Sequence, residues 1–218
     1  MMKKRARPPL SRDRVLRAAL MLADKAGVDA LSMRKIAQKL SVEAMSLYKH
    51  VANKDEVLEG LIDLVVGEIE VPPPGTPWKP AMRARALSAR DALRRHPWAI
   101  LLIQCMKPTA VRLGHNDRVL GLMREQGFPL SLAYRAFLLL DSYIYGFTTQ
   151  ELNWQSEDQG AVEGMQSQVL PAAYPYFSEV FAHVSNLVEI SGPTPAYDVE
   201  FNFGLDLILD SLGRLRDA

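Results

Sequence analysis

Between residues 31 and 54, apolar side chains recur at the spacing of two short helices joined by a tight turn. The first helix has one apolar face, formed by Met33, Ile36, Ala37 and Leu40. Residues 41–43 make the turn, and the second helix spans about residues 44–50. Its outward positions carry a hydroxyl, a phenol, an ammonium and an imidazole group, where a buried helix would carry none. This pattern is typical of a helix-turn-helix that enters a DNA groove.

Further helix signals flank this pair of helices. Ser11 is placed to cap a preceding helix, and Gly27 suits the C-terminus of that helix. Asn53 is placed to cap a following helix, with Glu56 three residues later as in a capping box. That helix runs to about residue 70, where the proline-rich residues 71–77 end it. Lys54 lies in its first turn, where free backbone N–H groups favour a phosphate.

The rest of the chain also has helical periodicity, and no segment shows the alternation of a strand. We therefore expect an all-α fold. Proline and glycine positions divide this part into helices at about residues 78–95 and 98–106, one from the break at 107–108 to residue 127, and three more at about 130–153, 169–187 and 197–215. Residues 155–168 are polar and contain two glycines, which predicts a mobile loop, and residues 191–195 predict a firm break.

Bulk composition narrows the class of protein. Of the 218 residues, 48% are hydrophobic and 23% are charged, as in ordinary globular proteins. The single cysteine, Cys105, excludes an intramolecular disulfide and suits a reducing cytoplasm. The basic start lacks the apolar core of a signal peptide, and the apolar runs are shorter than the roughly 20 residues of a membrane span. We expect a cytoplasmic protein with no membrane association.

Charge is divided unevenly along the chain. Residues 1–56 have a net charge of +7 and residues 57–218 have −6, although the whole chain has only +1. This asymmetry predicts an N-terminal domain, residues 1–56, that faces a polyanion, followed by a second domain, residues 57–218. The alternative explanation of the charge asymmetry is a basic tail that is only solvated and binds no partner. The basic arm, residues 1–10, either lies against DNA or has no role.

Two other classes of function compete with DNA binding. An enzyme is disfavoured, because the four histidines lack metal-ligand spacing and no nucleophile or phosphate-loop motif occurs. We accordingly expect no cofactor, no metal and no catalytic residue. The second alternative is a helical module that binds a small molecule or a partner without sequence-specific DNA binding. The charge division argues against it.

The N-terminal motifs together resemble those of the TetR family of bacterial transcriptional repressors. They are the patterns L-S-M-R-K-I-A-Q-K-L and S-L-Y-K-H-V, followed by N-K-D-E at the start of a long helix, and the resemblance covers about residues 11–70. Beyond them, Trp78 at a helix start, the pattern E-Q-G-F-P-L and the helix at 134–147 resemble the tetracycline-repressor type of C-terminal domain. Members of this family usually carry glycine in the turn, where this chain has Ser41.

The resemblance implies a homodimer that binds a palindromic double-stranded DNA operator and is released by a small-molecule effector. The last helix and the helix at 130–153 would form a four-helix bundle with their copies. The DNA-facing residues carried over by position are Arg34, Ala44, Met45, Ser46, Tyr48, Lys49, His50 and Lys54.

Side-chain chemistry assigns roles within this DNA-facing set. Lys54, Tyr48 and Lys49 suit phosphates, which position the protein without specifying sequence. Arg34 and Lys49 are able to reach a guanine edge, while Ala44 and Met45 suit thymine methyl groups. Ser46 suits a base or a phosphate. For His50 and Tyr48, packing within the domain remains the alternative.

The effector site is predicted as an apolar cavity with a few converging polar groups. Its candidate residues are Trp98, Gln104, Met106, Asn116, Met123, Phe137, Asp141 and Tyr145. Asp141 lies in a mostly apolar run, so its carboxylate needs a partner such as Arg135, Arg112 or a cationic ligand. The alternative is that these are ordinary core residues, with Asp141 at the dimer interface.

Overall fold

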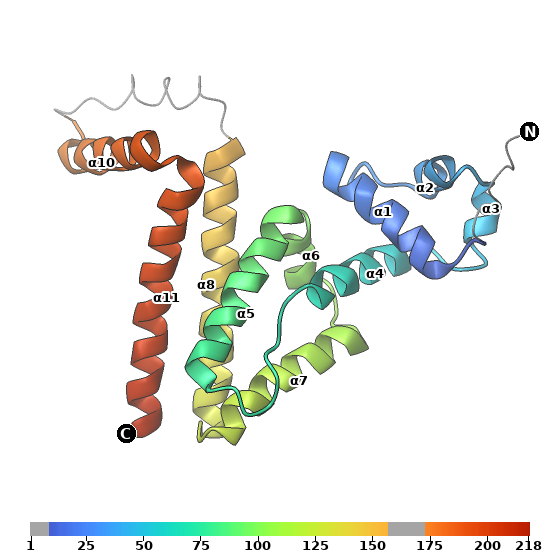
Figure 1. Ribbon diagram of the computed structural model, residues 1–218. Coiled ribbons are helices and arrows are strands. Elements are labelled where there is room, and N and C mark those ends of the chain that lie inside the picture. Colours follow the sequence, from blue (N-terminus) through green and yellow to red (C-terminus); the bar gives the residue numbers. More distant parts are fainter. Residues whose placement is uncertain (1–8, 157–172) are drawn as a thin grey trace, which may run out of the picture. The chain divides into compact units, whose positions relative to one another are not determined.

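The computed structural model describes residues 9–156 and 173–218, and within these two ranges the regular structure is helical, without a strand (Figure 1). The all-α class is thereby confirmed. Most of the basic arm and most of the loop predicted at 155–168 lie outside the described residues. Residues 155 and 156 belong to a helix instead.

The described helices follow one another along the chain in this order. They are α1 (Arg12–Ala26), α2 (Met33–Leu40), α3 (Ala44–Leu47), α4 (Lys54–Gly67), α5 (Trp78–Arg95), α6 (Ala99–Cys105), α7 (Ala110–Glu125), α8 (Leu130–Ser156), α10 (Pro175–Ser191) and α11 (Pro193–Asp217). None of the described helices combines the length and the apolarity of a bilayer-spanning segment.

The chain forms two compact units. The first runs to Glu70 and also contains Asp91–Arg118, and the second contains Val71–Arg90 and Val119–Ala218. All of α4 therefore belongs to the first unit. The functional division after residue 56 stays a prediction.

The first unit is built on a core shared by α1, α2, α3 and α4. Val15, Ile36, Leu47 and Leu61 come from these four helices, and all are completely buried. Ser11 accepts a hydrogen bond from the Arg14 N–H and so caps α1, as predicted. This core is what fixes the position of α3.

The second unit is organised around α8, which lies beside α11 (Figure 1). Ile144 of α8 and Leu205 of α11 are fully buried, and α10 packs on α11. Trp78, at the start of α5, meets the ring of Phe128 edge to face, with 4.8 Å between the ring centroids. Trp78 and Phe128, which belong to the motifs that resemble the tetracycline-repressor type of C-terminal domain, therefore pack together.

Two of the described helices begin at prolines. A firm break was predicted at 191–195, but α11 begins at Pro193. The helix α10 begins at Pro175, and the start predicted near residue 169 lies outside the described residues. Proline suits the first turn of a helix, because its missing N–H would have no intrahelical partner there. Proline therefore marks the start of a helix at these two positions, although it breaks helices elsewhere in the chain.

Candidate nucleic-acid interface and effector site

The turn between α2 and α3 is set by local hydrogen bonds. Ser32 caps α2 by accepting from the Lys35 N–H at 3.3 Å. At the other end, the Val42 N–H donates to the Ala37 carbonyl at 3.0 Å and the Ser41 N–H donates to the Gln38 carbonyl at 3.1 Å. This pairing closes α2 with a left-handed residue, and Ser41 has φ 56° and ψ 49°. Ser41 thus takes a left-handed conformation at the position where members of the family usually carry glycine.

The helix α3 is short and held from beneath. Leu47 is completely buried and Val51 is nearly so. The N–H groups of His50 and Val51 both donate to the Leu47 carbonyl, at 2.8 and 3.0 Å, and residues 48–50 are turns rather than the predicted helix. The apolar anchor leaves the opposite side of α3 open to solvent.

The predicted DNA-facing residues all lie at the surface of the first unit. Met45 is 74% exposed, and Tyr48, Lys49 and Arg34 are exposed as well. Ala44, Ser46, His50 and Lys54 are half-buried. The half-burial of His50 fits either contact with DNA or packing, so the individual roles stay predictions.

The start of α4 is capped from both directions. Asn53 Oδ1 accepts from the Glu56 N–H at 2.8 Å, as predicted. The Glu56 carboxylate reaches back to the Ala52 N–H at 2.6 Å, one residue before the cap, and also accepts from Arg12 Nε at 3.3 Å. The hydrogen bond from Ala52 is the main reason that the pKa of Glu56 lies below its ordinary value, and Arg12 adds to it. Lys54 is thus presented by a well-defined helix start.

A polar cluster that the sequence analysis missed ties α1 to the connection between α5 and α6. His96 is buried, and its Nδ1 lies 2.7 Å from Asp24 Oδ1. Trp98 Nε1 donates to the same Asp24 oxygen at 2.8 Å, and His96 Nε2 lies 3.4 Å from Glu68 Oε1. The sequence signal was weak, because Asp24 and His96 are 72 residues apart.

Four of the candidate effector residues lie in the first unit. Trp98 packs against its core, Gln104 is exposed, and Met106 and Asn116 are half-buried. The C-terminus of α6 is satisfied by Arg112, whose guanidinium donates to the Ile103 carbonyl at 2.5 Å. Arg112 is therefore committed to backbone oxygens.

The other four candidates lie in the second unit. Met123 is completely buried, while Phe137, Asp141 and Tyr145 are half-buried. Asp141 does have a cationic partner, but it is neither of the two arginines suggested from sequence, Arg135 and Arg112. Arg85 of α5 donates from Nη2 to Asp141 Oδ1 at 2.7 Å. Membership of all eight residues in one ligand site stays a prediction.

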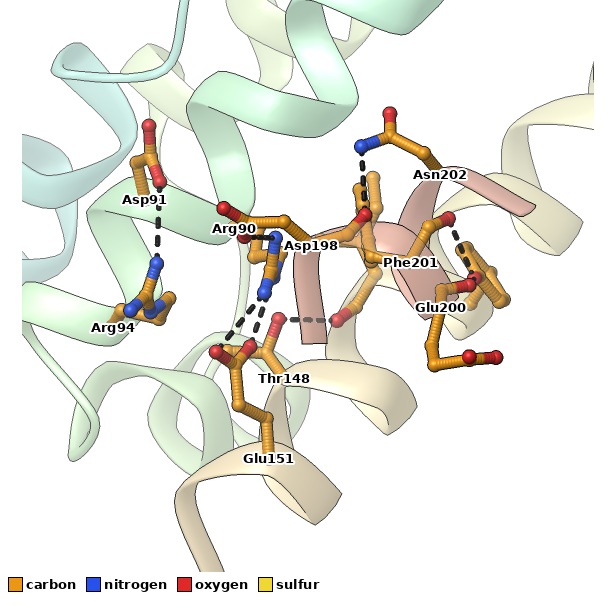
Figure 2. A network of polar contacts seen from close by, with 11 residues as sticks. Arg90, Asp91, Arg94, Thr148, Glu151, Asp198, Glu200, Phe201 and Asn202 are labelled. Carbon is orange, nitrogen blue, oxygen red and sulfur yellow. Dashed lines mark hydrogen bonds and ion pairs between the residues drawn. The ribbon is translucent and has the colours of Figure 1, made fainter. Parts of the chain in front are cut away.

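Arg90 is the centre of a second charged network that the sequence analysis missed (Figure 2). Its Nε and Nη2 donate to both oxygens of the buried Glu151 at 2.8 and 3.0 Å, and Nη1 donates to Asp198 at 2.7 Å. Burial lowers the pKa of Arg90, but the two carboxylates outweigh this effect and hold its pKa above the ordinary value. The network joins α5, α8 and α11.

A sequence signal for these arginines existed. Arg85 lies three residues after Met82 and four before Ala89, both of which are buried. On a helix, this spacing places the three side chains on one face. An arginine is able to occupy such a buried position because its long stem is apolar and its guanidinium is paired with a carboxylate. The carboxylates come from α8 for Arg85, and from α8 and α11 for Arg90.

Comparisons with known proteins agree with this architecture. Residues 15–61 match the family described as bacterial regulatory proteins, tetR family. Residues 71–215 match the family described as tetracyclin repressor-like, C-terminal domain. The two matches cover both the helix-turn-helix and most of the remaining chain.

Individual relatives extend over nearly the whole chain. The HTH-type transcriptional repressor DrrR1 of Streptomyces coeruleorubidus is 32% identical over 94% of this chain and 78% of its own length. Apo ActR from Streptomyces coelicolor has a TM-score of 0.75 at 27% identity, covering 95% of this chain and 96% of ActR. ActR in complex with actinorhodin also has a TM-score of 0.75, at 25% identity, covering 97% of this chain and 100% of that one.

Proposed function

The chain belongs to the tetR family of bacterial regulatory proteins, and we propose that it binds a palindromic DNA operator as a homodimer. It is a ligand-responsive transcriptional repressor and not an enzyme. The observation that carries the proposal is the surface of α3. Met45 of α3 and Tyr48, the residue directly after it, are exposed over a completely buried Leu47.

The DNA contacts are proposed to come from one face of the first unit. Arg34 of α2, residues 44–50 and Lys54 of α4 supply cationic, hydroxyl and methyl groups at its surface. The net charge of +7 in residues 1–56 supports binding to a polyanion. In this proposal residues 1–56 are the DNA-binding domain, and residues 57–218 bind the effector and form the dimer.

The dimer surface is proposed to lie on α8 and α11. These helices expose large apolar side chains that the described residues do not cover, namely Leu138, Leu139, Val199, Phe203 and Leu207. Exposed apolar patches of this kind mark association surfaces. A second copy would bury them in a four-helix bundle and place two recognition helices on the two halves of an operator.

The effector is proposed to be a small molecule bound within residues 57–218, whose binding lowers affinity for DNA. ActR, a structural relative, has been crystallised with (S)-DNPA and with actinorhodin. Binding of an effector to the folded protein would raise its melting temperature by mass action. A thermal-shift screen followed by a DNA-release assay would identify such a molecule.

Stoichiometry tests the dimer proposal. Sedimentation of the free protein is expected to give a dimer, and fluorescence anisotropy with promoter DNA to saturate at two chains per palindrome. The variant Phe203→Glu places a carboxylate in the proposed interface and is expected to yield monomers with weaker operator binding. The variant Glu125→Lys, at an exposed position of α7 and therefore outside α8 and α11, is the control. A monomeric wild-type protein that binds its operator fully would contradict the proposal.

A further inference from the structure

His96 is a buried imidazole with a carboxylate on each side. It follows α5 directly and is 6% exposed. Its Nδ1 lies 2.7 Å from Oδ1 of Asp24, in the last turn of α1, and its Nε2 lies 3.4 Å from Oε1 of Glu68, the residue after α4. All three residues belong to the first unit. The ring therefore joins the ends of α1 and α4 to the connection between α5 and α6.

The two carboxylates determine which form of the imidazole fits this position. An ionised carboxylate only accepts hydrogen bonds, and a neutral imidazole has one N–H and one lone pair. In one neutral tautomer the lone pair of Nδ1 would face Asp24 at 2.7 Å, and in the other the lone pair of Nε2 would face Glu68 at 3.4 Å. Only the imidazolium presents an N–H to both carboxylates.

The charges around the ring agree with this form. Arg95, the last residue of α5, donates from Nη2 to the other oxygen of Glu68 at 2.6 Å. Asp24, Glu68 and Arg95 carry two negative charges and one positive charge, so a proton on His96 balances the group. The C-terminus of α5 favours a cation here and the N-terminus of α6 opposes it, so the two helix ends offset each other.

A second donor holds Asp24 beside the ring. Trp98 Nε1 donates to the same Asp24 oxygen at 2.8 Å, and Trp98 packs against the core of the first unit. This contact does not depend on the proton of His96. Loss of the proton would therefore leave the ring between two carboxylates with a single N–H.

We propose that His96 is a proton-dependent clamp, whose imidazolium holds the ends of α1 and α4 together and whose deprotonation loosens them and weakens operator binding. Imidazole is the side chain that ordinarily changes charge between pH 5 and 8. The helices α2 and α3 share one core with α1 and α4, and a looser unit loses more conformational entropy when DNA orders it. This second step rests on the function proposed above. His96 acts through α1 and α4 and is a positioning residue.

The melting temperature of the full-length protein between pH 5.5 and 8.5 tests the clamp. Because the folded arrangement favours the imidazolium, its contribution is present at low pH and is lost as the pH rises. The wild type is expected to exceed His96→Gln by about 2–4 °C at pH 5.5 and to lose this advantage by pH 8.5. The control His183→Gln removes an exposed imidazole on α10 and should keep the wild-type profile.

A double-mutant cycle tests the assigned partner. In Asp24→Asn, the side chain opposite Nδ1 is neutral and is able to donate as well as accept, so a neutral imidazole is no longer disfavoured there. Replacing His96 by Gln in this background is expected to have a smaller and less pH-dependent effect on the melting temperature than in the wild type.

A measurement on the wild-type protein does not depend on the folding of any variant. Nitrogen-15 NMR at pH 5.5 is expected to show both ring nitrogens of His96 protonated. The ring is assigned through its proximity to Trp98, whose ring centroid lies 6.0 Å away. As the pH rises, loss of one of these protons should coincide with shifts of the backbone amide signals of Asp24 and Glu68.

Promoter affinity tests the second step. Between pH 6 and 8, the affinity of the wild type is expected to fall about threefold to tenfold more than that of His96→Gln, which is part of the effect of one linked proton. His50, in the DNA-facing set, is present in both proteins, so its own titration cancels in this comparison.

The outcomes separate this inference from the proposed function. A wild-type advantage that does not change with pH, a single protonated ring nitrogen on His96 at pH 5.5, or an equal pH dependence of promoter affinity in the two proteins would overturn the inference while promoter binding stays intact. Failure of the wild-type protein to bind promoter DNA at any pH would instead overturn the proposed function and, with it, the second step. The melting temperatures and the NMR spectrum of the free protein would still decide the clamp.

Discussion

At the scale of residues, Ser41 determines how the chain leaves α2. Its φ of 56° lies in the left-handed region, where a residue with a Cβ atom is strained by roughly 1–2 kcal/mol. The hydrogen bonds from Ser41 and Val42 to carbonyls of α2 hold this conformation. The direction of α3, and with it the DNA-facing surface, depends on a residue that stores strain.

Replacing Ser41 by glycine is expected to raise the free energy of unfolding by about 0.5–1 kcal/mol. Glycine relieves the left-handed strain but loses part of the gain to its greater freedom in the unfolded chain. Chemical denaturation would measure the change. The variant Ser41→Ala keeps the Cβ atom and should leave stability close to that of the wild type. A destabilised Ser41→Gly protein would show that the serine side chain makes a contribution larger than the strain.

At the scale of elements, the approach of α1 to α4 depends on a residue without a side chain. A Cβ atom on Gly60 would lie 2.6 Å from Cδ2 of the buried Leu16. The two helices pack at this point, and α4 continues from there to Gly67. Gly60 therefore sets how closely the helix that follows the recognition helix lies against the first one.

The variant Gly60→Ala is expected to lower the free energy of unfolding by about 1–3 kcal/mol, the usual cost of overpacking a core. A Cβ atom on Gly67, in the same helix, would meet only open space, and Gly67→Ala should leave stability unchanged or raise it by up to about 1 kcal/mol. Thermal unfolding of both variants makes the comparison. Equal effects would mean that the α1–α4 contact is not tight at Gly60.

The elements themselves were largely predictable, because their signals are local. Trp78–Arg95 was obtained with both ends, and the caps at Ser11, Ser32 and Asn53 follow from residue type and spacing. Prolines were ambiguous, since Pro193 suits either a break or a first helical turn. The end of α3 depends on how Leu47 and Val51 pack, which periodicity alone does not contain.

At the scale of the whole molecule, the exposure of the predicted DNA-facing residues follows from sequence, whereas the partners of the predicted effector-site residues do not. The DNA-facing surface comes from one contiguous segment, so its exposed side follows from helical spacing. The effector site draws on side chains far apart in the chain. The ion pair between Arg85 and Asp141 spans 56 residues, and the pairs of Arg90 span 61 and 108. Such pairings become visible only once the helices are packed.

The salt dependence of promoter binding tests the central claim most directly, namely that the helix-turn-helix face binds DNA. Neutralising phosphates releases counterions, so the logarithm of the binding constant should fall linearly with the logarithm of salt concentration, by about 0.9 for each phosphate. Lys54→Ala should weaken all DNA sequences about equally and flatten this slope by about one. Lys107→Ala, at an exposed lysine outside the motif, should leave it unchanged. Promoter binding that is absent or indifferent to salt, or an altered sequence preference in Lys54→Ala, would contradict the account.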